Sequence, residues 1–172
     1  MTRRDRLRRV VRLCAHFAHN MAYYRAGRDR LTKASPDFWK VVNSNFIDMA
    51  VLEWCKLLGD RNGKHSWAKV VAEPMRFEKT MLVNLGMTAD QLATYITEMR
   101  TYRDKFLAHL DDLPTMNIPF LDTARAAVEF YHREVVEHEA LAGDLAGLPT
   151  DLAEYYRNCF EQAQAIYGHS GP

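Results

Sequence analysis

The chain has 172 residues, of which 48% are hydrophobic, and its formal net charge at pH 7 is +1. This length suits one domain with its own core, so we expect a single domain over residues 1–172, and the apolar fraction excludes a disordered chain. No apolar run approaches the roughly 20 residues that span a bilayer, and no uninterrupted apolar stretch follows the N-terminal arginines as in a secretory signal. We therefore expect a cytoplasmic protein with no membrane partner.

The first 33 residues are strongly basic, with ten arginines or lysines against two aspartates. Their apolar residues recur at the three- and four-residue spacing of one helix face, which comprises Leu7, Val10, Val11, Cys14, Phe17, Ala18 and Met21. Arg8, Arg9 and Arg12 gather on the other side. Two interpretations stay open for them: a solvated surface that balances the acidic remainder of the chain, or a patch that binds RNA phosphates.

Start and stop signals place the remaining helices. Ser35 and Pro36 are typical of an N-cap and a first-turn proline, and Thr88 with Gln91 of a capping box. The expected helical segments run from Pro36 to Gly59, over 66–85 with a break at Pro74, from Thr88 to about Leu110, over 119–142 and over 150–167. Without a hairpin signal, the predicted fold class is all-α, an antiparallel bundle of about five to six helices, with the three separated cysteines in its core.

The expected helix 88–110 carries an arginine where its apolar stripe should continue. That stripe consists of Leu92, Ile96, Met99, Phe106, Leu110 and Leu113. Arg103 occupies the gap in it, and a guanidinium there needs a carboxylate, a backbone carbonyl or an anionic ligand such as phosphate, because it cannot lose its proton. His109, six residues further on, is a titratable group near that cation.

The heptapeptide from Arg103 to His109 resembles the signature of the HEPN superfamily. These small helical proteins carry an arginine, then a polar residue, then a histidine four to six positions beyond the arginine, places that Arg103, Asp104 and His109 fill here. The continuation to Asp111 looks like the abortive-infection (AbiU-like) branch. Residues 46–60 and 65–69 are similar to the stretch that this branch carries upstream of its motif.

The resemblance implies a metal-independent endoribonuclease of a defence or toxin–antitoxin system, with no cofactor. Arg103 would stabilise charge on the phosphate, His109 would transfer a proton, and Asp104 would fill the polar place of the motif. Lys105 and the three N-terminal arginines are the expected RNA contacts. An ideal helix turns by roughly 240° over six residues, so Arg103 and His109 of one chain would not converge. The resemblance implies a homodimer that shares the site, with RNA and an antitoxin or other protein as partners.

A non-catalytic interpretation of the same residues stays open. Arg103 can pair with Asp104 or a carbonyl at a helix end, and His109 can interact with the helix dipole. The chain would then be a HEPN-like helical dimer that binds nucleotide, RNA or a protein. No metal site is expected, because Glu129 and His132 form a single Glu-x-x-His pair where a di-iron site needs two. We expect His132 and His138 to be solvated.

Overall fold

The computed structural model describes residues 1–108 and 120–169, and the described residues form helices joined by turns, without a strand. The α-helices are α1 (Arg3–Arg30), α2 (Asp37–Trp54), α3 (Trp67–Val70), α4 (Pro74–Leu85), α5 (Ala89–Tyr102), α6 (Leu121–Glu134) and α7 (Leu152–His169). The all-α prediction is confirmed. The described residues hold one α-helix more than the six expected segments, because the passage 66–85 divides before Pro74 into α3 and α4. None of the described helices is long and apolar enough to cross a membrane.

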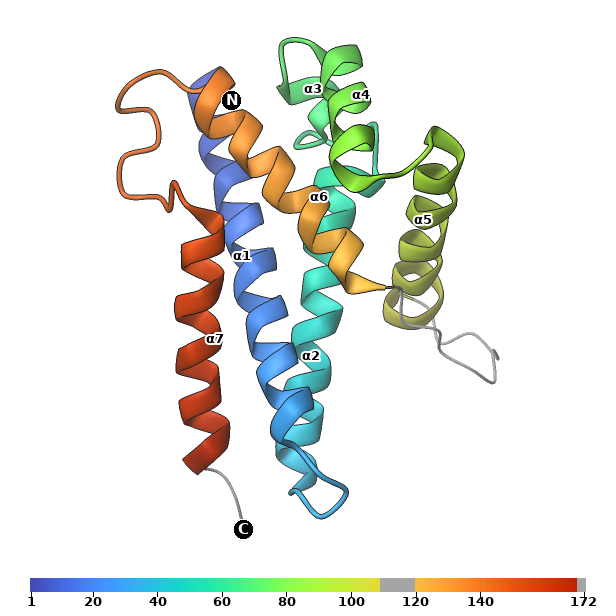
Figure 1. Ribbon diagram of the computed structural model, residues 1–172, viewed down its shortest axis with the longest axis vertical. Helices are drawn as coiled ribbons and strands as arrows, with labels where there is room; N and C mark the ends of the chain where they lie inside the picture. Colours follow the sequence, from blue (N-terminus) through green and yellow to red (C-terminus); the bar gives the residue numbers. More distant parts are fainter. Residues whose placement is uncertain (109–119, 170–172) are drawn as a thin grey trace.

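The centre of the molecule is formed by α1 packed against α2 and α7 (Figure 1). A capping box between Thr2 and Asp5 starts α1, and all seven residues of its predicted apolar stripe are buried. The helix α2 returns antiparallel to α1 after a short connection. In contrast, α7 runs in the same direction as α1, so the bundle is not antiparallel throughout.

One glycine on α1 allows the close approach of two neighbouring helices. A Cβ atom at Gly27 would lie 2.0 Å from the side-chain oxygen of Asn43 on α2 and 2.8 Å from the ring of Tyr167 on α7. Real Cβ atoms never approach other atoms so closely, so any larger residue would push these helices apart. Gly27 therefore marks a packing contact within α1 rather than a helix stop.

Buried carboxylates at the C-terminal end of α6 join this helix to the beginnings of α1 and α4. The Glu139 side chain accepts a hydrogen bond from the backbone N–H of Ala72 (2.7 Å) and pairs with Arg3 of α1. Glu134 on α6 pairs with Arg76 of α4. Because a buried carboxylate needs such partners, these contacts hold α1, α4 and α6 in one arrangement.

Three helices end in a wider, π-helical turn: Cys55–Gly59 after α2, Arg103–Ala108 after α5, and Val135–Glu139 after α6. The predicted helix from Thr88 to Leu110 is therefore α-helical only to Tyr102, and residues 109–119 are outside the described part of the chain. The predicted helix 119–142 begins at Leu121, and its π-helical turn ends at Glu139. Single π-helical turns are rare and occur often at functional sites.

Candidate functional site

Arg103 is the first residue of the π-helical turn that follows α5, and two carboxylates hold its side chain. Its Nε donates to Oδ1 of Asp104 (2.7 Å), and its Nη1 donates to Oδ2 of Asp60 (2.6 Å). These two hydrogen bonds raise the pKa of Arg103 above its already high ordinary value, although burial opposes this, so the guanidinium stays charged. The prediction that Arg103 needs a partner is confirmed, and the partners are carboxylates.

Asp60 reaches Arg103 from the other π-helical turn at this end of the molecule. Its backbone N–H donates to the carbonyl of Cys55 (2.9 Å), which fixes Asp60 as the residue that ends the turn after α2. Its Oδ1 also lies 3.9 Å from Nε of Arg100, so Asp60 stands between two arginines. In the sequence, Asp60 directly follows the predicted helix that ends at Gly59, and no role was expected for it. Its position as the last residue of the 46–60 similarity is the signal that could have identified it.

The buried side of α5 fixes the position of Arg103. Met99 and Tyr102 are almost fully buried, and the Tyr102 hydroxyl donates to Oδ1 of Asp48 on α2 (2.7 Å). Tyr95, one heptad earlier, donates through its hydroxyl to the carbonyl of Phe120 (2.8 Å). The backbone that carries Arg103 is therefore attached to both α2 and the start of α6, and such support is needed where a side chain must meet a substrate in a defined geometry.

The second half of the predicted site is outside the described residues. His109 belongs to the segment 109–119, so its distance from Arg103 is not part of the structure. The described residues of the motif, Arg103–Ala108, form a π-helical turn rather than a continuation of α5 as an α-helix. Lys105, a predicted RNA contact, is exposed and borders a shallow surface depression together with Asp104 and Arg100.

Cys55 is a buried thiol near Arg103, and its surroundings disfavour the nucleophilic thiolate form. Its Sγ lies 3.8 Å from the backbone carbonyl of Met99 in the core between α2 and α5. Burial raises the pKa of Cys55 to about 12, and the nearby guanidinium of Arg103 only partly opposes this. A thiol with such a pKa is almost entirely protonated near neutral pH. The chemistry available beside Arg103 is therefore charge stabilisation rather than covalent attack by cysteine.

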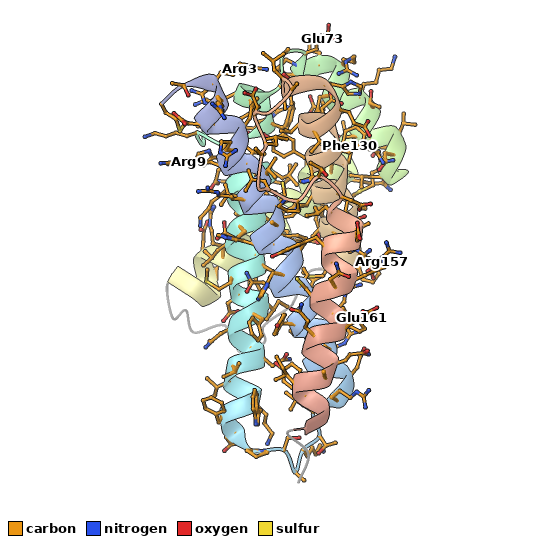
Figure 2. The ribbon with its side chains drawn as sticks, turned by 90° about the vertical axis from the view of Figure 1, so that its left-hand side faces the viewer. Arg3, Arg9, Glu73, Phe130, Arg157 and Glu161 are labelled. Carbon is orange, nitrogen blue, oxygen red and sulfur yellow. The ribbon has the colours of Figure 1, made fainter. Side chains whose placement is uncertain are left out.

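The predicted basic stripe of α1 divides into two kinds of residue. Arg8 donates through Nη1 to the carbonyls of Asp144 (2.7 Å) and Ala146 (3.1 Å), and through Nη2 to Ala146 (3.2 Å), so it holds the loop between α6 and α7. Arg9 and Arg12 are exposed and make no hydrogen bond or ion pair with the described residues. Figure 2 shows Arg9 on the outer side of α1. RNA binding by Arg9 and Arg12 stays a prediction.

His132 is buried, which makes the expectation of a solvated side chain wrong. It lies on the inner side of α6, and its Nε2 is 3.0 Å from the carbonyl oxygen of Pro149. Since a carbonyl can only accept, Nε2 carries the proton, and burial lowers the pKa of His132. His138 is half exposed, as expected. Among the described residues, no group of three or more potential metal ligands comes together.

Comparisons with known proteins add no relative to this description. No protein-family model matches the chain, and searches of curated proteins and of solved structures also give no significant match.

Proposed function

We propose that the chain is a metal-independent endoribonuclease of the HEPN type, acting in a defence or toxin–antitoxin system. The observation that carries this proposal is the arginine of the motif, held in a fixed orientation by Asp60 and Asp104 at the start of a π-helical turn. Among the described residues, Nη2 of Arg103 has no hydrogen-bond partner, so one edge of the guanidinium remains for a phosphate oxygen.

In the proposed reaction the 2′-hydroxyl of the RNA is the nucleophile. A histidine removes the proton of the hydroxyl, whose oxygen forms a bond to the adjacent phosphorus while the bond from phosphorus to the 5′-oxygen breaks. The leaving oxygen takes up a proton, and the product carries a 2′,3′-cyclic phosphate. His109 is the proton-transfer group, and Arg103 stabilises the charge that develops on the phosphate oxygens. Asp60 and Asp104 are positioning residues.

The proposed active form is a homodimer with the two motif helices near the symmetry axis. Two copies would supply two histidines, one to remove and one to deliver a proton. Arg9, Arg12 and Lys105 are the proposed contacts to the RNA backbone, and an antitoxin or other protein is the proposed further partner. Sedimentation at micromolar concentration tests the assembly: we expect a dimer, and a monomer would contradict the shared site.

A non-catalytic HEPN-like dimer that binds nucleotide, RNA or a protein is the second candidate. The observation that favours it is the neutralisation of Arg103 by two carboxylates, which lowers its attraction for phosphate. In this case Arg103 is a structural link between the ends of α2 and α5. The two candidates differ in one measurable property, because only the first breaks RNA.

Incubation of the purified protein with mixed RNA in EDTA separates these candidates. We expect cleavage that leaves 2′,3′-cyclic phosphate ends and that stops when the 2′-hydroxyls are replaced by hydrogen. Loss of a proton-transfer group typically lowers a rate by about 10²–10⁴-fold, so His109→Ala should show a decrease of that size while remaining folded. RNA that stays intact with the wild type would leave the binding module as the function, and equal cleavage rates for wild type and variant would contradict the role of His109.

A further inference from the structure

A groove of about 510 Å³ lies beside the Arg103 cluster, between the turn at 59–62, α4 and α5. This volume falls within the roughly 300–1,000 Å³ that small-molecule sites occupy in proteins. None of the described motif residues, 103–108, lines the groove. The groove adjoins the motif, however, because Asp60 lines the groove and also accepts the hydrogen bond from Nη1 of Arg103.

The floor of the groove is apolar and comes mainly from one face of α5. Ala89, Ala93 and Ile96 follow one another at the spacing of a helix face, and the small side chains of both alanines leave room above the helix. Leu92 and Trp67 complete the floor. Such a surface can cover the flat face of a planar ligand.

The rim of the groove carries both donors and acceptors. Arg61 pairs with Glu78 (2.7 Å), and its guanidinium carbon lies 5.3 Å from the centre of the Trp67 ring. Arg100 lies 3.9 Å from Asp60. The two arginines are more than half exposed, and exposed ion pairs contribute little to stability, so a ligand can replace these pairings at low free-energy cost.

The composition of the rim selects the chemistry of the ligand. A simple anion would be repelled by Asp60 and Glu78, and a simple cation by Arg61 and Arg100. A nucleobase has a flat apolar face for the floor, and its edge presents both acceptors for arginine and donors for carboxylate. We propose that this groove binds one nucleobase of an RNA strand, next to the phosphate that Arg103 contacts.

The position of the base beside the cleaved bond rests on the proposed nuclease function. Binding of the base in the groove does not depend on cleavage. Because Asp60 contacts Arg103 and lines the groove, a base in the groove and a phosphate at Arg103 lie on the two sides of one carboxylate. The groove then decides which nucleotide stands beside the cleaved bond, and it gives the nuclease a preference that backbone contacts cannot provide.

A short fluorescent 2′-O-methyl RNA of mixed sequence tests the proposal, because it binds without being cleaved. Ala93→Phe should fill the groove and weaken binding by about tenfold, because the stacking and edge contacts to one base are then lost. Thr94→Phe is the matched control, because Thr94 is exposed on the same helix and does not line the groove. Arg61→Gln should also weaken binding, whereas Lys79→Gln, an exposed charge change on α4, should not.

A strand of the same backbone without bases completes the test. The wild type should bind it no better than Ala93→Phe binds the complete strand. Equal affinity of the wild type for both strands, or equal affinity of Ala93→Phe and Thr94→Phe for the complete strand, would overturn the nucleobase site even if the protein cleaves RNA. If no RNA is cleaved but affinity depends on Ala93 and on the bases, the nuclease proposal fails and the nucleobase site stands.

Discussion

Arg8 and Arg103 are both half-buried arginines that the sequence associates with RNA, and the structure gives them different partners. Arg8 donates to backbone carbonyls of the loop between α6 and α7, whereas Arg103 donates to the carboxylates of Asp60 and Asp104. The hydrogen bonds of Arg8 hold the backbone of this loop in place, and their carbonyl acceptors carry no net charge. The carboxylates orient Arg103 beside an open groove. The partner of an arginine and the space next to it indicate its role better than its neighbours in the sequence.

The largest expected effect on stability comes from Arg8. Arg8→Ala removes the donors for the carbonyls of Asp144 and Ala146, and we expect the free energy of unfolding to fall by about 1–3 kcal/mol. Urea unfolding should give a lower midpoint at an unchanged slope. Arg12→Ala is the matched control, because its exposed side chain has no partner among the described residues. Equal stability of both variants would remove the structural role of Arg8.

Asp60 tests whether the carboxylates position Arg103 for chemistry. Asp60→Asn keeps the size of the side chain and leaves an acceptor for Nη1, but it removes the charge that orients the guanidinium. We expect kcat for RNA cleavage to fall by about tenfold, because even a small displacement of the Arg103 guanidinium would misplace it relative to the phosphate. KM should rise by a smaller factor, because Asp60 also lines the groove proposed for the nucleobase. A variant that loses stability but keeps kcat would make Asp60 purely structural.

The loop held by Arg8 is also held by His132, and this contact is sensitive to pH. Burial lowers the pKa of His132 in the folded state, so below the unfolded value of about 6.5 the unfolded chain binds a proton that the folded chain does not. Stability should therefore fall as the pH decreases from 7 to 5, by at most about 1.4 kcal/mol per pH unit for this group. Thermal unfolding over that range should show a weaker pH dependence for His132→Gln, whose amide can still donate to Pro149. The same slope in both proteins would contradict this role.

Arg9 and Arg12 give the smallest expected effect, which concerns binding rather than stability. If both contact phosphates, replacing them by Gln should weaken RNA affinity and reduce the slope of log K against log salt by about 0.7 for each contact. The urea midpoint should not change, because neither side chain has a partner among the described residues. Filter binding at several salt concentrations measures the slope. An unchanged slope would make this surface a solvated helix face.

The periodic pattern of the sequence predicts the buried face of α1 but not that of α2, although both helices are predicted. In α1 a single apolar face is buried, and its seven predicted residues all lie in the core. In α2 the apolar run through Trp39, Val42, Phe46 and Met49 is only partly buried, and Met49 is exposed. The buried face of α2 contains Ile47, Ala50, Val51 and Trp54 instead. When a helix has apolar residues on several sides, packing against other helices decides which side is buried. The sequence of the helix alone does not contain this information.

The sequence predicts that Arg103 belongs to the candidate site, but it does not predict the residues and the groove that surround Arg103. An arginine in an apolar stripe requires a partner, and Asp104 follows it directly. Asp60 is 43 positions away, so only the fold brings it to Arg103. The π-helical turns that carry both residues have no simple sequence signal, because the same residues fit an α-helix. The groove depends on the relative position of α4 and α5, which no motif of the chain specifies.

The most direct test of the central claim, that Arg103 takes part in the reaction, is the rate of RNA cleavage in EDTA. This rate is measured for Arg103→Ala and for Arg8→Ala at a temperature where both variants are folded. Removal of one group that stabilises charge in a transition state typically lowers the rate by about 10²–10³-fold, so we expect Arg103→Ala to lose activity to this extent. Arg8→Ala should cleave at nearly the wild-type rate despite its lower stability. Wild-type activity in Arg103→Ala, or an equal loss in both variants, would contradict the assignment of Arg103 to the reaction.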